Sequence, residues 1–186
     1  MQIRLAADLQ SDSIVDGEGI RTVIWTQGCP HNCTGCHNPL THDFNGGEVV
    51  DIEDVYNAID ELEGQDGITF SGGDPFMQAK ACAKLAKYAK SKGYNIWCYT
   101  GFRYEELLEK AKKDSSIMDF LKQVDILVDG RFVLSLKSYN LLFRGSSNQR
   151  IINVPLSLIK GEVVLEDRFD YKEEVSHRTR LAGIYV

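Results

Sequence analysis

The stretch IRTVIWTQGCPHNCTGCHNP, residues 20–39, joins a strand-like run to a short loop that holds three of the five cysteines in the chain. Residues 20–27 are rich in β-branched side chains, which favours a β-strand. Cys29, Cys33 and Cys36 follow at once. Three clustered cysteines in a chain with an odd cysteine count indicate a metal site rather than a disulfide framework.

Beyond this loop, short apolar runs alternate with amphipathic stretches, which is the pattern of an α/β protein with a mainly parallel sheet. We expect further strands at residues 67–73, 94–101, 124–130 and 149–158, and helices at residues 51–64, 74–93 and 103–113. Asp51 and Asp74 are the expected N-caps of the first two helices, and Gly64 is expected to end the first one. Right-handed crossovers of such units predict a partial (β/α) barrel, formed as a single domain over residues 1–186.

The loops that follow the predicted strands carry the candidate functional residues. They are the cysteine loop and the segments SGGDP, YTG and VDGRF, at residues 71–75, 99–101 and 128–132. Functional loops of such folds lie at the carboxyl ends of the parallel strands. We therefore expect all four segments to open onto the same face of the protein.

Composition narrows the function class further. A net charge of −6 argues against a nucleic-acid-binding protein that works by phosphate neutralisation. The sequence has no run of about 18 apolar residues, so we expect no membrane span. Residues 1–10 lack the basic start and apolar core of a secretory signal, and this favours a cytoplasmic protein, whose cysteines are kept reduced.

The three cysteines leave two interpretations open. A structural zinc ion would need a fourth ligand, for which His31 is better placed than His37, because His37 directly follows Cys36. Alternatively, a [4Fe–4S] cluster held by three thiolates keeps one iron free of protein ligands, as a catalytic centre requires. Such an iron can be chelated by a small molecule with an amine and a carboxylate.

The spacing Cys-x3-Cys-x2-Cys after the first strand of the repeating units resembles the signature of the radical S-adenosylmethionine superfamily. That resemblance implies the partial barrel of this superfamily and a [4Fe–4S] cluster, one per chain, whose open iron binds S-adenosylmethionine. One electron then cleaves the cosubstrate to methionine and a 5′-deoxyadenosyl radical, which abstracts a hydrogen atom from the target.

Further segments resemble one branch of this superfamily, the glycyl-radical-enzyme activases. DGEGIRT precedes the cysteines, SGGDP and VDGRF follow them, and RGSSNQRI spans residues 144–151. Together with the compact length, these segments are most similar to the activases of anaerobic ribonucleoside-triphosphate reductase, over about residues 14–153. The resemblance implies a glycine on the large subunit of that reductase as the target, and flavodoxin or ferredoxin as the electron donor. An activase of another glycyl radical enzyme, a radical enzyme for a small molecule and a zinc-binding interaction module are the alternatives.

The resemblance also assigns residues. Cys29, Cys33 and Cys36 would hold the cluster. The cosubstrate would be contacted by Gly35, Cys36, His37, Gly72, Gly73 and Asp74. Gly35 stands where many relatives carry an aromatic residue against the adenine, and His37 is the candidate to replace it. Asp74 stands where a glutamate is usual, although DP is also an ordinary helix start.

The remaining candidates have both a structural and a functional interpretation. Cys82 and Cys98 lie at apolar positions and are expected in the core. Asp129 and Arg131 are either turn residues or neighbours of the cosubstrate. The loop at residues 144–150 either grips the radical-bearing loop of the partner or is a plain surface loop.

Overall fold

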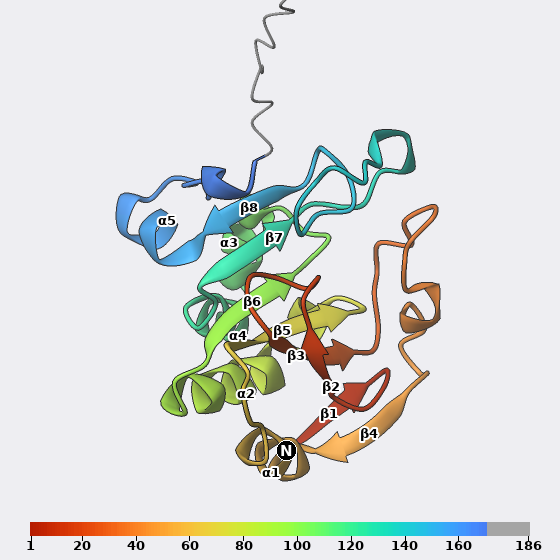
Figure 1. Ribbon diagram of the computed structural model, residues 1–186, viewed down its shortest axis with the longest axis vertical. Coiled ribbons are helices and arrows are strands. Elements are labelled where there is room, and N and C mark those ends of the chain that lie inside the picture. The colour runs from red at the N-terminus through yellow and green to blue at the C-terminus, as the bar shows by residue number, and fades with distance from the viewer. Residues whose placement is uncertain (171–186) are drawn as a thin grey trace, which may run out of the picture.

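The computed structural model describes residues 1–170 and has one mixed β-sheet at its centre (Figure 1). The strands are β1 (Gln2–Leu5), β2 (Gln10–Ser13), β3 (Arg21–Thr26), β4 (Glu48–Asp51), β5 (Gly67–Gly72), β6 (Asn95–Tyr99), β7 (Ile126–Asp129) and β8 (Arg150–Asn153). Their order is β4-β1-β3-β5-β6-β7-β8, and β2 pairs with β3 beside this path. The four central strands β3, β5, β6 and β7 are parallel, whereas the outer pairs are antiparallel. The sheet is open.

Helices follow two of the four central strands, β5 and β6, and also the outer strands β4 and β8. The α-helices are α1 (Ile52–Asp60), α2 (Ala79–Ser91), α3 (Tyr104–Ala111), α4 (Ser115–Leu121) and α5 (Val154–Lys160). Four short 3-10 helices are η1 (Pro39–Thr41), η2 (Pro75–Gln78), η3 (Leu134–Leu136) and η4 (Asp167–Phe169). Within residues 1–170, no helix has the length and apolar character that crossing a membrane requires.

Alternating side chains of the strands give the sheet two different faces. Ile96 and Cys98 of β6 are fully buried in the main core, together with residues of α1, α2, α3 and α4. Trp97 and Tyr99 point to the opposite face, where a smaller apolar cluster lies. Cys82 of α2 is also fully buried, so both isolated cysteines are core residues, as predicted.

Arg21 fixes the amino-terminal ends of three parallel strands. Its guanidinium is fully buried and donates to Thr69 Oγ1 at 2.6 Å, to the carbonyl of Ile68 at 2.9 Å and to Asn95 Oδ1 at 2.8 Å. Burial lowers the pKa of Arg21 to about 10. One side chain thus crosslinks β3, β5 and β6 at the ends opposite to the cysteine loop.

Two of the predicted helix starts hold, and two other predicted boundaries do not. The prediction that Gly64 ends the first helix is wrong, because α1 already ends at Asp60 with Glu61 as its C-cap. Asp74 caps η2, because its side chain accepts from the backbone N–H of Phe76. Asp51 precedes α1 in an extended conformation but makes no side-chain capping bond. The prediction of a strand over residues 149–158 is wrong beyond Asn153, where β8 ends. The Asn153 side chain accepts from the backbone N–H of Leu156 at 3.1 Å and starts α5.

The loops after the parallel strands lie along one edge of the sheet. In Figure 1 the long loop after β3 and the loop after β7 both extend from the right-hand side, where the arrowheads of the central strands point. This arrangement follows from the parallel pairing, since the carboxyl ends of parallel strands share an edge. It brings the cysteine loop, residues 71–75, residues 99–101 and residues 128–132 together.

Candidate iron–sulfur site

The three clustered cysteines line one cavity of about 110 Å³ at this edge. Each of the four predicted loops contributes to its walls. The lining includes Cys29, Cys33 and Cys36 from the first loop, Gly72 and Gly73 from the second, Thr100 and Gly101 from the third, and Gly130 and Phe132 from the fourth. The expectation that these loops share one face is confirmed.

Backbone contacts hold the start of the cysteine loop in place. The N–H groups of Gly28 and Cys29 donate to the carbonyls of Thr41 and His42, at 2.9 and 3.1 Å. The carbonyl of Gly28 accepts in turn from the backbone N–H of Asp74 at 2.9 Å. The loop is therefore tied both to the chain that follows it and to the end of β5.

Glycine is required at positions 72 and 73, because the end of β5 lies very close to the residues at the start of the cysteine loop. A Cβ at Gly73 would lie 2.4 Å from the carbonyl oxygen of Gly28, and one at Gly72 would lie 2.5 Å from that of Thr26. Gly72 also has φ +102°, a conformation that favours glycine. The glycine pair thus lets β5 pack against the first residues of the cysteine loop, and it leaves its own backbone at the cavity wall.

Asp74 is completely buried, and its carboxylate is hydrogen-bonded by other groups of the chain. Besides Phe76, it accepts from Thr100 Oγ1 at 2.9 Å and from the Gly101 backbone N–H at 3.0 Å, and it pairs with His31 Nε2 at 2.8 Å. Asp74 therefore joins three of the loops around the cavity. Its contact with a cosubstrate stays a prediction.

His31, the better placed candidate for a fourth zinc ligand, lines the cysteine cavity. Its Nε2 is engaged by Asp74, and its ring packs edge-on against Phe102 with centroids 4.4 Å apart. Among residues 1–170, no three His, Cys, Asp or Glu side chains converge closely enough to hold a single metal ion. A structural zinc ion needs four such ligands at about 2.0–2.3 Å, so the described geometry gives the zinc interpretation no ligand set.

The surroundings of Cys29 and Cys33 disfavour the free thiolate. Burial raises the pKa of Cys29 to about 11 and raises the pKa of Cys33 as well. The backbone N–H of Phe132 and the charge of Arg131 act in the opposite direction on Cys33. Metal binding to such thiols must release protons, because only thiolates bind iron.

A second cavity, of about 500 Å³, adjoins the first. The two share Cys36, Ser71, Tyr99, Phe132 and Gln149 as lining residues. The second cavity lies over the sheet face opposite to α1–α4, and apolar side chains supply much of its wall, among them Ile14, Val15, Trp25, Leu141, Leu142 and Phe143. The cysteine cavity therefore borders a space large enough for a nucleoside-sized molecule.

The predicted adenine neighbours occupy different places. His37 lines the larger cavity beside Phe132, with ring centroids 5.1 Å apart. Gly35 belongs to the wall of neither cavity. It has φ +76°, and a Cβ there would touch the side chain of Leu134 at 3.0 Å. Phe132 lines both cavities, and the sequence patterns assign it no role, although it lies in the segment VDGRF.

Comparison with known proteins agrees with this site. Residues 15–152 match the family described as a 4Fe-4S single cluster domain. A relative from Salmonella typhi, named anaerobic ribonucleoside-triphosphate reductase-activating protein, is 36% identical over 144 residues, which are 73% of this chain and 90% of the relative. Proteins of the same name from Escherichia coli K12 and Enterobacteria phage T4 are 33% and 30% identical, over 73% and 74% of this chain and 90% and 86% of their own lengths. The chain belongs to the family of anaerobic ribonucleoside-triphosphate reductase-activating proteins.

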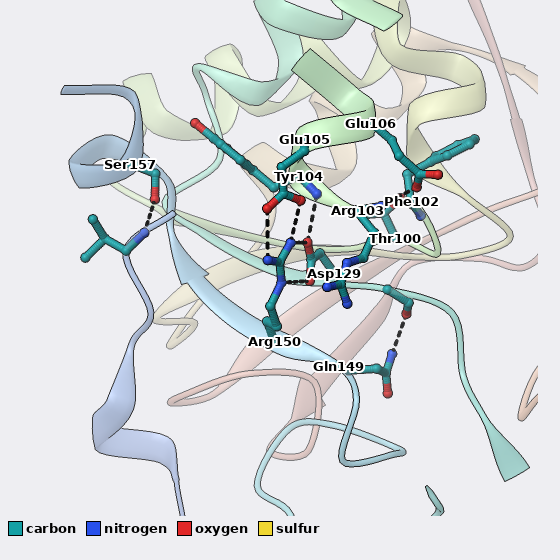
Figure 2. Close-up of polar contacts among 12 residues, drawn as sticks. Thr100, Phe102, Arg103, Tyr104, Glu105, Glu106, Asp129, Gln149, Arg150 and Ser157 are labelled. Carbon is teal, nitrogen blue, oxygen red and sulfur yellow. Dashed lines mark hydrogen bonds and ion pairs between the residues drawn. The ribbon is translucent and has the colours of Figure 1, made fainter. Parts of the chain in front are cut away.

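In this family member, the side chain of Asp129 binds groups of neighbouring elements and has a structural role (Figure 2). Its carboxylate is fully buried, accepts from the backbone N–H of Tyr104 at 2.7 Å and pairs with the Arg150 guanidinium. Arg150 also forms a double hydrogen bond with Glu105, at 3.0 and 2.8 Å, and lowers the pKa of that carboxyl to about 2. Asp129 thus links β7, β8 and the start of α3, whereas the Arg131 side chain is exposed.

Proposed function

We propose that this activating protein uses a [4Fe–4S] cluster and S-adenosylmethionine to generate a glycyl radical on the large subunit of anaerobic ribonucleoside-triphosphate reductase. The observation that carries the proposal is the cavity where three cysteines and the backbone of Gly72–Gly73 meet, directly beside the larger cavity. The names of the relatives support the partner, and the matching family supports the cluster. We further propose a single domain with the partial-barrel topology of radical S-adenosylmethionine enzymes, in a cytoplasmic setting.

The proposed ligands of the cluster are Cys29, Cys33 and Cys36. All three line the same cavity. When bound, the cluster supplies the electron that cleaves S-adenosylmethionine to methionine and 5′-deoxyadenosine, the hydrogen atom coming from a glycine Cα of the partner. A flavodoxin or ferredoxin is the proposed source of that electron.

The chain's own residues have positioning and shielding roles in this proposal. The backbone at Gly72 and Gly73 offers polar groups to the methionine part of the cosubstrate, and His37 and Phe132 form the aromatic side of the adenosine site. The apolar wall at Ile14, Val15 and Leu142 keeps water away from the reacting atoms once the partner covers the opening.

Metal analysis tests the cluster. Anaerobic reconstitution with iron and sulfide is expected to give about four of each per chain and a brown colour that air bleaches. A parallel reconstitution with zinc is the control, and it should not yield a protein that cleaves S-adenosylmethionine. Stoichiometric zinc with full activity and no sulfide would reject the cluster.

Electron paramagnetic resonance tests the reaction. Mixing the loaded protein with the reductase, a reductant and S-adenosylmethionine is expected to produce a glycyl doublet, because hydrogen abstraction leaves the unpaired electron on a backbone Cα. A reductase whose radical-site glycine is replaced by alanine is the control and should give no doublet. Cosubstrate cleavage without a doublet on the wild-type reductase would instead point to another glycyl radical enzyme or to a small-molecule substrate.

A further inference from the structure

The loop at residues 144–150 is folded around the side chain of one residue, Gln149. The Gln149 Oε1 atom accepts from the backbone N–H groups of Gly145 at 2.9 Å and Ser146 at 3.1 Å. The Arg144 guanidinium donates to the backbone carbonyl of Gln149 at 3.2 Å. The loop is therefore closed on itself by hydrogen bonds.

The same loop grips the segment at residues 130–133, which follows β7. Gln149 Nε2 donates to the carbonyl of Gly130 at 3.0 Å, as the dashed line at Gln149 in Figure 2 marks. Asn148 Nδ2 donates to the carbonyl of Arg131 at 2.9 Å, and Ser146 Oγ accepts from the backbone N–H of Val133 at 3.1 Å. Three side chains of the loop thus bind the backbone of this segment.

The gripped segment is a wall of the candidate site. Gly130 and Phe132 line the cysteine cavity, and Phe132 also lines the larger cavity. The ring of Phe132 lies against His37 and so close to Gly145 that a Cβ there would be 2.9 Å away. Gln149 itself lines both cavities. The position of this wall consequently depends on the loop that Gln149 closes.

We propose that Gln149 is a positioning residue that holds the Gly130–Phe132 wall in place for the cosubstrate. The amide suits this role because one end accepts two N–H groups from the loop while the other end donates to the wall. A glutamate would keep the accepting end but would place a carboxylate oxygen against the Gly130 carbonyl. The proposal rests on the proposed function, since it assigns the cosubstrate to these two cavities.

The variants Gln149→Glu and Gln149→Ala test the roles of the two ends of the amide separately. Glutamate removes only the donating end, whereas alanine removes both ends. Hydrogen exchange on the full chain, with and without the cluster, is expected to be faster at residues 130–133 in both variants. Exchange at Gly145 and Ser146 is expected to rise only in Gln149→Ala, because glutamate still accepts from these amides. The dissociation constant and KM for S-adenosylmethionine are expected to rise about tenfold in Gln149→Glu, with kcat changed less than about twofold, as loss of one partly buried hydrogen bond predicts.

Ser147→Ala is the matched control, because Ser147 lies in the same loop and its side chain is exposed. It should match the wild type in exchange, affinity and turnover. Faster exchange at residues 130–133 with unchanged affinity for S-adenosylmethionine would overturn the positioning role, and so would unchanged exchange in Gln149→Glu. A wild-type protein that binds no S-adenosylmethionine would refute the proposed function, while the exchange data would still decide whether Gln149 holds the wall.

Discussion

A Cys33→Ala variant is expected to lose the cluster and, with it, all reductive cleavage of S-adenosylmethionine. Cys33 lies in the wall of the cysteine cavity, and two remaining thiolates cannot hold a cluster that depends on three. Iron and sulfide in the reconstituted variant should fall to background, together with the visible absorption. Methionine and 5′-deoxyadenosine, measured after adding a reductant, should be undetectable.

Cys82→Ala is the matched control for this experiment. Cys82 belongs to α2 and is fully buried in the core on the helical side of the sheet, and it does not line the cysteine cavity. Its replacement should leave iron, sulfide and cleavage at the wild-type level and lower the free energy of unfolding by about 1 kcal/mol. Equal loss of iron in both variants would mean that the ligands are assigned to the wrong cysteines.

The second large effect is expected for Asp74→Asn. The buried carboxylate accepts from Thr100, from the backbone of Phe76 and Gly101, and pairs with His31. An amide must turn its own N–H2 group toward some of these donors, which leaves buried polar groups unsatisfied. We expect the free energy of unfolding to fall by about 2–4 kcal/mol, as urea titration of the cluster-free chain can measure.

Asp114→Asn provides the comparison. Asp114 is also an N-cap aspartate, of α4, and its side chain accepts from the backbone N–H of Ser116 at 3.0 Å. It is exposed, and asparagine is an equally good N-cap, so the urea midpoint should stay unchanged. Equal midpoints for the two variants would show that the Asp74 network contributes nothing beyond its capping bond.

Local signals in the sequence predict the parallel centre of the fold well. Residues 20–27 and 67–73 are short apolar runs that end in cysteines or glycines, and each forms a strand whose end carries the site. Prediction fails where a single polar contact ends a strand or where a helix or strand is very short. β8 ends within an apolar run because Asn153 caps a helix, and α4 has only seven residues. The outer antiparallel strands β1, β2 and β4 have four residues each and offer too little alternation to be recognised.

The site is predictable only where its parts are close in sequence. The three cysteines form one motif, and they line one cavity. The pairing of His31 with Asp74 and the grip of Gln149 on Gly130 join residues 43 and 19 positions apart. Such contacts depend on how the loops meet at the edge of the sheet, which spacing within a motif does not specify.

The backbone bonds at Gly28 and Cys29 have a consequence for metal insertion. Carbonyls of Thr41 and His42 fix these amides, and the tight packing at Gly73 fixes the same turn from the other side. These contacts join protein groups to one another and restrict the conformation of this part of the loop without any metal–ligand bond. We therefore expect removal of iron to leave the fold around the cavity intact, whereas a zinc finger depends on its metal for folding.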